Sequence, residues 1–340
     1  MRWLGRNLIT ALILLLLWKV VPPFIDWAFV SAVWQPDSAV CRQAKGACWG
    51  FIAEKHRFIL FGTYPYDQHW RPAMATLLLL GLWFLSAWRV FWKPRLVLLW
   101  IAGLCAIGVL MWGGALGLPY VEQERWGGLI LTLLLTTFGI AAAFPLSILL
   151  ALGRRSELPL LRAFCVGYIE LIRGVPLISL LFMASVMLPL FLPAGVSLDK
   201  LLRAQLALIL FAAAYLAEVV RGGLQAIPKG QYEAAAAVGL SYWGTTLFVV
   251  LPQALRIAVP PLVSTFIGFF KDTSLVVIIG VFDLLQAIKV SLNDPAWTGF
   301  GVEAYLFAAI VYFVFCFAMS LYSRKLEHPH RKAYDPHLAI

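Results

Sequence analysis

Three pairs of oppositely charged residues interrupt long apolar stretches of this sequence: Glu170 and Arg173, Glu218 and Arg221, and Lys271 and Asp272. A charge in hydrocarbon costs at least about 2.5–3.5 kcal/mol, so each of these residues requires a charged partner or water. Such residues can form ion pairs that hold helices in register, or they can bind a charged solute. We interpret Glu218 and Arg221 as a structural ion pair, because their i, i+3 spacing places both on one helix face.

The other two pairs are candidates for a solute path. Glu170 and Arg173 also have i, i+3 spacing, but a glycine and a proline follow within three residues and would open the helix beside them. The sequence therefore leaves both roles open for this pair. Lys271 and Asp272 are neighbours that point in different directions, which favours pairing across helices or contact with a pore.

The sequence shows few residue patterns that could support catalysis. The five histidines show no spacing typical of a metal site, and no convincing nucleophile stands with a base. The Gly-x-x-x-x-Gly-Lys-Ser/Thr phosphate loop is absent, so the chain does not cradle a nucleotide by that means. We predict no catalytic residue, no metal and no cofactor bound by this chain.

The composition indicates a membrane protein. Hydrophobic residues make up 62% of the 340 residues and charged residues 13%, against roughly half and a quarter in a soluble domain. Several apolar stretches reach about 20 residues, the length of a helix that crosses the hydrocarbon core. The sequence predicts an all-α polytopic chain with about eight spans, at 7–29, 72–92, 96–118, 126–152, 160–192, 203–224, 256–285 and 302–323.

The spans divide the chain into three regions. Residues 1–124 form a three-helix N-terminal extension with an external loop at 30–71, residues 125–323 form a five-helix core, and residues 324–340 form a cytoplasmic tail. An even number of spans places both termini in the cytoplasm, and Lys and Arg favour the segments so assigned, as the positive-inside rule requires. The net charge of +10 is dispersed, so we expect membrane lipid, and no nucleic acid, as a partner.

Cys41 and Cys48 share one polar loop, which this topology places outside the cytoplasm. A disulfide can form and persist in that compartment. The sequence leaves a Cys41–Cys48 disulfide and two free thiols as alternatives.

The segment 225–255 breaks the hydropathy pattern. Its stretch 234–255 carries no formal charge, but it contains too many glycines, hydroxyl groups and prolines for a simple lipid-facing span. Four residues carry helix start and stop signals, namely Pro228 for a first turn, Gly239 for a left-handed cap, Ser241 for an N-cap and Pro252 for a stop. We therefore predict two short helices joined at the glycine, as an elbow on the cytoplasmic face.

The residues of this elbow carry a resemblance to a known family. The pattern consists of Glu233, Ala234, Ala235, Gly239, Leu251 and Pro252. This pattern resembles the EAA loop shared by the permeases of ABC importers. One position departs from the family pattern, because Val249 stands where Ile is commoner.

Longer stretches of the core resemble, more narrowly, the permeases of polar amino-acid importers of the His/Glu/Gln/Arg/opine type. The matching stretches are 127–136, 170–177, 217–233 and 271–275. With its three additional helices and aromatic external loop, the chain is most similar to the M subunits of general L-amino-acid transporters.

The resemblance implies a type I ABC importer fold and a non-catalytic permease that translocates L-amino acids across the bacterial inner membrane. It also implies the partners. These are a homologous second permease in a heterodimer, two copies of a cytoplasmic ABC ATPase that holds ATP and magnesium, and a periplasmic amino-acid-binding protein.

The same resemblance suggests roles for the elbow residues in contact with the ATPase. Glu233 would supply charge and hydrogen-bond acceptors, while Ala234 and Ala235 would permit close approach. Gly239 would set the turn, and Leu251-Pro252 completes the motif.

An amino-acid zwitterion needs a cation near its carboxylate and an acceptor near its ammonium, and the four path residues Glu170, Arg173, Lys271 and Asp272 can supply them. The alternative is a secondary transporter driven by protons or sodium, with Glu170, Glu218 or Asp272 as the carrier site. That alternative predicts uptake by this chain alone.

Overall fold

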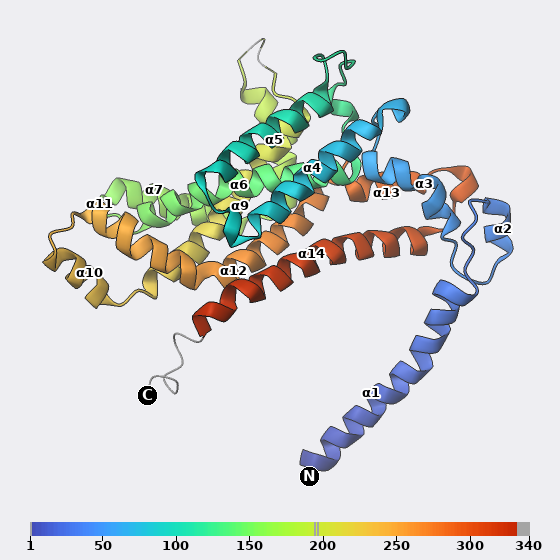
Figure 1. Cartoon of the computed structure of the whole chain (residues 1–340), viewed down its shortest axis with the longest axis horizontal. Helices are drawn as coiled ribbons and strands as arrows, with labels where there is room; N and C mark the ends of the chain where they lie inside the picture. The colour runs from blue at the N-terminus through green and yellow to red at the C-terminus, as the bar shows by residue number, and fades with distance from the viewer. Residues whose placement is uncertain (1, 194, 196, 332–340) are drawn as a thin grey trace.

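The protein is almost entirely helical. The structure, a computed structural model, describes residues 2–193, 195 and 197–331 (Figure 1). This part of the chain contains two isolated β-bridges but no β-strand. The predicted all-α class is confirmed. The α-helices are α1 (Arg2–Ile25), α2 (Ser38–Gln43), α3 (Gly50–Phe61), α4 (Trp70–Ser86), α5 (Pro94–Trp112), α6 (Gly128–Arg154), α7 (Pro159–Gly174), α8 (Leu177–Phe182), α9 (Lys200–Gln225), α10 (Lys229–Ala237), α11 (Tyr242–Gly244), α12 (Leu251–Asp272), α13 (Leu284–Ser291) and α14 (Gly301–Arg331).

Most of the predicted spans have a counterpart among these helices. Within the described residues, six helices are long and apolar enough to cross a membrane, and one bent helix pair makes a seventh candidate. α4 corresponds to the remaining predicted span, but its 17 residues lie at the lower limit of about 17–25 residues for a crossing helix.

The predicted single helix at 160–192 is broken. α7 and the helix Leu177–Phe191 meet at an angle of 103°. Val175, which lies between them, has extended backbone, because the residue before a proline, here Pro176, avoids the helical region. The seventh predicted span, 256–285, is also shifted, since the continuous helix extends from Tyr242 to Ile279.

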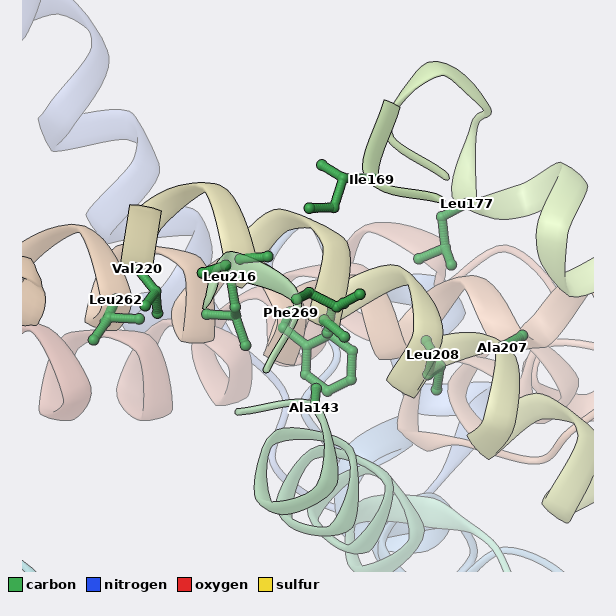
Figure 2. Close-up of a cluster of buried hydrophobic side chains, with 14 of the residues drawn as sticks. Ala143, Ile169, Leu177, Ala207, Leu208, Leu216, Val220, Leu262 and Phe269 are labelled. Atoms are coloured by element: carbon green, nitrogen blue, oxygen red, sulfur yellow. The ribbon is translucent and has the colours of Figure 1, made fainter. Parts of the chain in front are cut away.

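The core lies between α6, α9 and α12. α9 contributes a row of buried alanines, namely Ala204, Ala207, Ala212, Ala213 and Ala217. Small side chains allow helix backbones to approach closely within a membrane. Figure 2 shows Leu208, Leu216 and Val220 of α9 in the same cluster as Leu262 and Phe269 of α12. This close packing fixes the relative positions of Arg154, Glu218 and Asp272, which lie on these three helices.

Short helices gather at the two opposite ends of the bundle (Figure 1). α2, α3 and α13 lie at one end, which we call the cap end, and α10 and α11 lie at the other, which we call the elbow end. The name cap denotes residues 31–69. α1 stands apart from the other long helices (Figure 1), and the apolar stretch of this span is not buried by the rest of the chain. α1 therefore joins the molecule through the cap.

Several polar contacts fasten the cap to the α13–α14 region. Lys55 Nζ lies 2.6 Å from Asp294 Oδ2, and the backbone N–H of Cys48 donates to Glu303 Oε1 at 3.0 Å. Arg42 donates to the carbonyl oxygen of Pro295 at 3.0 Å. These contacts join segments that lie at opposite ends of the sequence.

The structure also joins Cys41 and Cys48 in a disulfide, with their Cα atoms 5.5 Å apart. Both cysteines are buried. They belong to a small apolar cluster that includes Phe51, Trp297 and Ala304. The disulfide therefore stabilises the part of the cap that packs against α14.

Candidate functional site: the elbow and the charged network

The turn of the elbow depends on one glycine. Gly239 follows α10 with φ of +77°, in the left-handed region that favours glycine because it has no Cβ. Its N–H donates to the carbonyl oxygen of Ala236 at 3.0 Å, which ends the helix. Ser241 begins the next helix, since its Oγ accepts from the N–H of Gly244 at 3.2 Å. The predicted left-handed cap and N-cap are therefore confirmed.

The elbow presents an uncovered surface. Glu233 and Ala234 are exposed, and Val238 is 76% exposed. Ala235 is only 4% exposed. Its side chain packs against this chain, so only Ala234 of the two alanines is available for close approach by a partner.

The second arm of the elbow is not a short helix, and the predicted stop at Pro252 is wrong. α11, a π-helical stretch at Thr245–Val250 and α12 form one continuous span, Tyr242–Ile279, of 38 residues. Pro252 lies at the start of α12, directly after the π-helical stretch. A proline in a regular α-helix clashes with the carbonyl group four residues earlier. The i→i−5 pattern of the π-helix accommodates the ring there.

Side-chain contacts hold α10 against the rest of the chain. Gln253 Nε2 donates to Gln231 Oε1 at 2.9 Å, and Arg155 Nη2 donates to Tyr232 Oη at 3.4 Å. Leu251 packs against the main apolar cluster. The elbow is thus connected to both α6 and α12.

One carboxylate joins three helices at the elbow end. Glu218 of α9 lies 2.9 Å from Arg154 of α6, 3.6 Å from Arg173 of α7 and 2.8 Å from Arg221 of its own helix. Arg154 also lies 2.9 Å from Glu170. The side chain of Glu218 is 15% exposed. These five residues, which we call the arginine network, therefore lock α6, α7 and α9 together.

The network confirms one predicted pair and replaces another. Glu218 and Arg221 pair as the i, i+3 spacing predicts. Glu170 does not pair with Arg173 on the same helix face. Instead, Glu170 forms an ion pair with Arg154, and Arg173 forms one with Glu218. Sequence analysis missed Arg154, since an arginine at the end of a long apolar helix is typical of a membrane interface and reveals no partner.

Asp272 lies on the wall of a cavity of about 390 Å³ between α6, α9 and α12. Tyr215, Ser264 and Thr265 add hydroxyl groups to the lining, which is otherwise largely apolar. Among the lining residues, all of which the structure describes, Asp272 alone carries a charge. Largely apolar cavities of this size with a few polar groups are typical of small-molecule sites.

The other predicted path residues differ in their position relative to this cavity. The guanidinium carbon of Arg173 lies 5.6 Å from the centre of the Tyr215 ring, so Arg173 connects the arginine network to the cavity wall. Lys271 is exposed and does not line the cavity. The structure therefore brings Arg173 close to the cavity of Asp272 but places Lys271 on another surface. In the part of the chain that the structure describes, no group of His, Cys, Asp and Glu could hold a metal ion.

The fold and these features define a class, the membrane-spanning permeases of ABC transporters. The family described as "Binding-protein-dependent transport system inner membrane component" matches residues 143–329, just over half of the chain. The chain belongs to this family. It is a permease subunit and a transport component, as the sequence predicts.

Relatives and solved structures give the same assignment. The chain is 49% identical to the inner membrane amino-acid ABC transporter permease protein YhdY of Escherichia coli K12, over 98% of this chain and 91% of the relative. It is 39% identical to the glutamate/glutamine/aspartate/asparagine transport system permease protein BztC of Rhodobacter capsulatus, over 89% of this chain and 83% of the relative.

The chain also matches a crystal structure of an amino acid ABC transporter with histidines. The match covers 59% of this chain and 92% of the chain in that structure, with 30% identity and a TM-score of 0.53. The predicted type I ABC importer fold is confirmed. Nothing in these comparisons supports the alternative of a secondary transporter.

Proposed function

We propose that this chain carries L-amino acids inward across the bacterial inner membrane, as one permease of a transporter powered by a separate ATPase. The observation that carries the proposal is the exposed elbow, in which Glu233 and Gly239 precede an unbroken 38-residue span. The relatives YhdY and BztC, which are named as amino-acid transport permeases, support the substrate class.

The proposed assembly contains a homologous second permease as a heterodimer partner, two ABC ATPase subunits and a periplasmic amino-acid-binding protein. ATP and magnesium belong to the ATPase, and this chain binds no cofactor. Both termini lie in the cytoplasm, with the elbow end facing the ATPase and the cap end facing the binding protein. Within the chain, residues 125–323 form the transport core and residues 1–124 an extension that carries the cap.

Coupling follows from the continuity of the second arm. The helix that begins at Tyr242 reaches Asp272 without interruption. At 1.5 Å per residue, it links the elbow to the Asp272 cavity across about 45 Å. A displacement of the elbow by the ATPase therefore moves the cavity wall. The same displacement reaches α9 through the elbow's first arm, and thus the arginine network.

The cavity and the network supply complementary groups for a zwitterion. Asp272 accepts hydrogen bonds from the substrate ammonium, and Arg173, beside Tyr215, binds the carboxylate as the substrate moves toward the elbow end. Glu170 forms an ion pair with Arg154, and Arg154 in turn forms an ion pair with Glu218. Lys271 takes part where the second permease supplies the facing wall.

A pull-down tests the proposed coupling. The tagged chain is purified from detergent-solubilised membranes as wild type and as Glu233→Lys, and partners are identified by mass spectrometry. We expect the wild type to recover a P-loop ATPase and a second permease, and the variant to lose only the ATPase. Recovery of an active chain alone, with uptake that an ionophore abolishes, would support the secondary transporter instead.

Uptake assays test the path. Asp272→Asn and Arg173→Ala are each expected to lower amino-acid uptake while leaving recovery of the ATPase unchanged. Unchanged uptake in both variants would refute the assignment of the path to this cavity.

A further inference from the structure

A hollow of about 620 Å³ lies at the elbow end, between the α6–α7 turn and α11. Its lining has two parts. The apolar and aromatic residues are Leu149, Leu152, Leu158, Leu161, Tyr242 and Trp243, and the polar residues are Arg155, Ser156 and Glu157. Neither the arginine network nor the cavity of Asp272 contributes a residue to this lining.

The residues around the hollow are of the types expected at the boundary between hydrocarbon and headgroups. Leu149, on the last turns of the α6 span, is 65% exposed, and Trp243 is 60% exposed. Aromatic side chains such as Tyr242 and Trp243 are enriched at membrane–water interfaces. The apolar side of the hollow is therefore continuous with the exposed apolar surface of α6, and its polar side lies at the end of that span.

Two opposite charges line the polar side without neutralising each other. Arg155 and Glu157 are both exposed, and no ion pair among the described residues includes either of them. Among the described residues, the side chain of Arg155 makes one hydrogen bond, the long 3.4 Å contact with Tyr232 Oη. A guanidinium group binds phosphate through a planar fork, and a carboxylate accepts hydrogen bonds from an ammonium group.

We propose that this hollow binds a phospholipid whose headgroup carries both a phosphate and a primary ammonium, as in phosphatidylethanolamine. Arg155 binds the phosphate, Glu157 accepts from the ammonium, and an acyl chain lies along Leu149 and Leu161. A choline headgroup has no N–H to donate, and a glycerol headgroup has no cation. The pair of charges thus selects for an aminophospholipid.

The bound lipid would contact the elbow directly. Tyr242 and Trp243 begin the second arm, and Tyr232 of α10 contacts Arg155. A lipid in the hollow therefore braces the elbow against α6. Its placement in the cytoplasmic leaflet rests on the proposed function, whereas its binding does not.

Native mass spectrometry of the purified, delipidated transporter tests the proposal. The complex is titrated with phosphatidylethanolamine, phosphatidylcholine and phosphatidylglycerol that carry identical acyl chains, without ATP or substrate. We expect one phosphatidylethanolamine to bind about tenfold more tightly than the other two, the ratio expected from one charge-assisted hydrogen bond. Glu157→Gln should remove this preference, and Arg155→Gln should weaken binding of all three lipids.

Arg162→Gln is the matched control, because Arg162 is exposed on the neighbouring helix α7 and does not line the hollow. It should leave the preference intact. Equal binding of the three lipids by the wild type, or a preference for phosphatidylglycerol, would overturn the proposal. So would a preference that appears only after the ATPase is removed, because the ATPase would then cover the hollow. Glu233→Lys should keep the lipid preference while losing the ATPase, which separates this site from the coupling role of the elbow.

Discussion

The two ends of the bundle are held together by different kinds of contact. At the cap end, a buried apolar cluster, one ion pair and hydrogen bonds that involve backbone groups fasten residues 31–69 to the α13–α14 region, and a disulfide cross-links the cap itself. At the elbow end, an arginine network joins α6, α7 and α9, and the elbow itself is largely exposed. The single ion pair of the cap end is backed by covalent and apolar contacts, whereas the arginine network contains several ion pairs that can exchange partners. From this difference we expect the cap end to be the more rigid of the two and movement to be concentrated at the elbow end.

Removing the central carboxylate gives the largest expected effect. Glu218→Gln leaves three arginines without the negative charge that they share, and because these ion pairs are only partly buried the cost should lie between those of exposed and buried pairs, at about 2 kcal/mol. Glu170→Gln, at a side chain that is 55% exposed, should cost less than about 1 kcal/mol. Thermal unfolding of the purified transporter measures both. Equal losses of stability in the two variants would show that Glu218 is not the central residue of the network, and would weaken the comparison between the two ends.

The next effect concerns the glycine of the elbow. Gly239→Val places a β-branched residue at φ of +77°, which costs about 2 kcal/mol and displaces Glu233 relative to α11. We expect ATP hydrolysis per transported substrate to rise while membrane insertion is unchanged. Gly239→Asn is the control, because asparagine tolerates this backbone region. Normal coupling in the valine variant would contradict the proposed role of the turn.

The cap should be stabilised by its disulfide without affecting the elbow. Cys41→Ser removes a cross-link that closes a short loop, so the cap should lose up to about 2 kcal/mol. Limited proteolysis of residues 31–69 should become faster, while the ATPase is recovered as before. A change in coupling would show that the two ends are not independent.

The smallest effect is a dependence on pH at the cap end. The hydrogen bond from Lys55 lowers the pKa of Asp294 below its ordinary value. This contact therefore contributes to stability above the ordinary pKa of about 3.9 and is lost as the pH falls through the lowered folded-state pKa. Hydrogen exchange of the cap should become faster on acidification below about pH 4, and Asp294→Asn should abolish that dependence. An unchanged pH profile in the variant would assign the dependence to another group.

Local signals predicted the elbow well. The left-handed turn at Gly239 and the N-cap at Ser241 both depend on residues within a few positions of each other. Pro252 was predicted wrongly, because the π-type hydrogen bonds of the preceding stretch accommodate its ring within one continuous helix. The role of Glu233 at the ATPase stays a prediction.

Contacts between distant segments were not accessible from the sequence. Arg154 meets Glu218 only because α6 and α9 pack closely, and that packing depends on a row of alanines rather than on any charge pattern. Pro176 indicated that the helix at 160–192 could open, but the angle of 103° between its two parts depends on packing. The sequence predicted the cap as a loop, and the contacts that hold it come from distant residues, namely Asp294 and Glu303.

The attachment of the cap has a consequence for the order of assembly during synthesis. The contact between Cys48 and Glu303 joins residues that are 255 positions apart. At a synthesis rate of about 5–20 residues per second, the cap waits about 13–50 s for its partner to emerge. The disulfide between Cys41 and Cys48 spans only seven positions, so it can form during that interval. The cap thus remains without one of its contacts until the start of α14, which carries Glu303, has been synthesised.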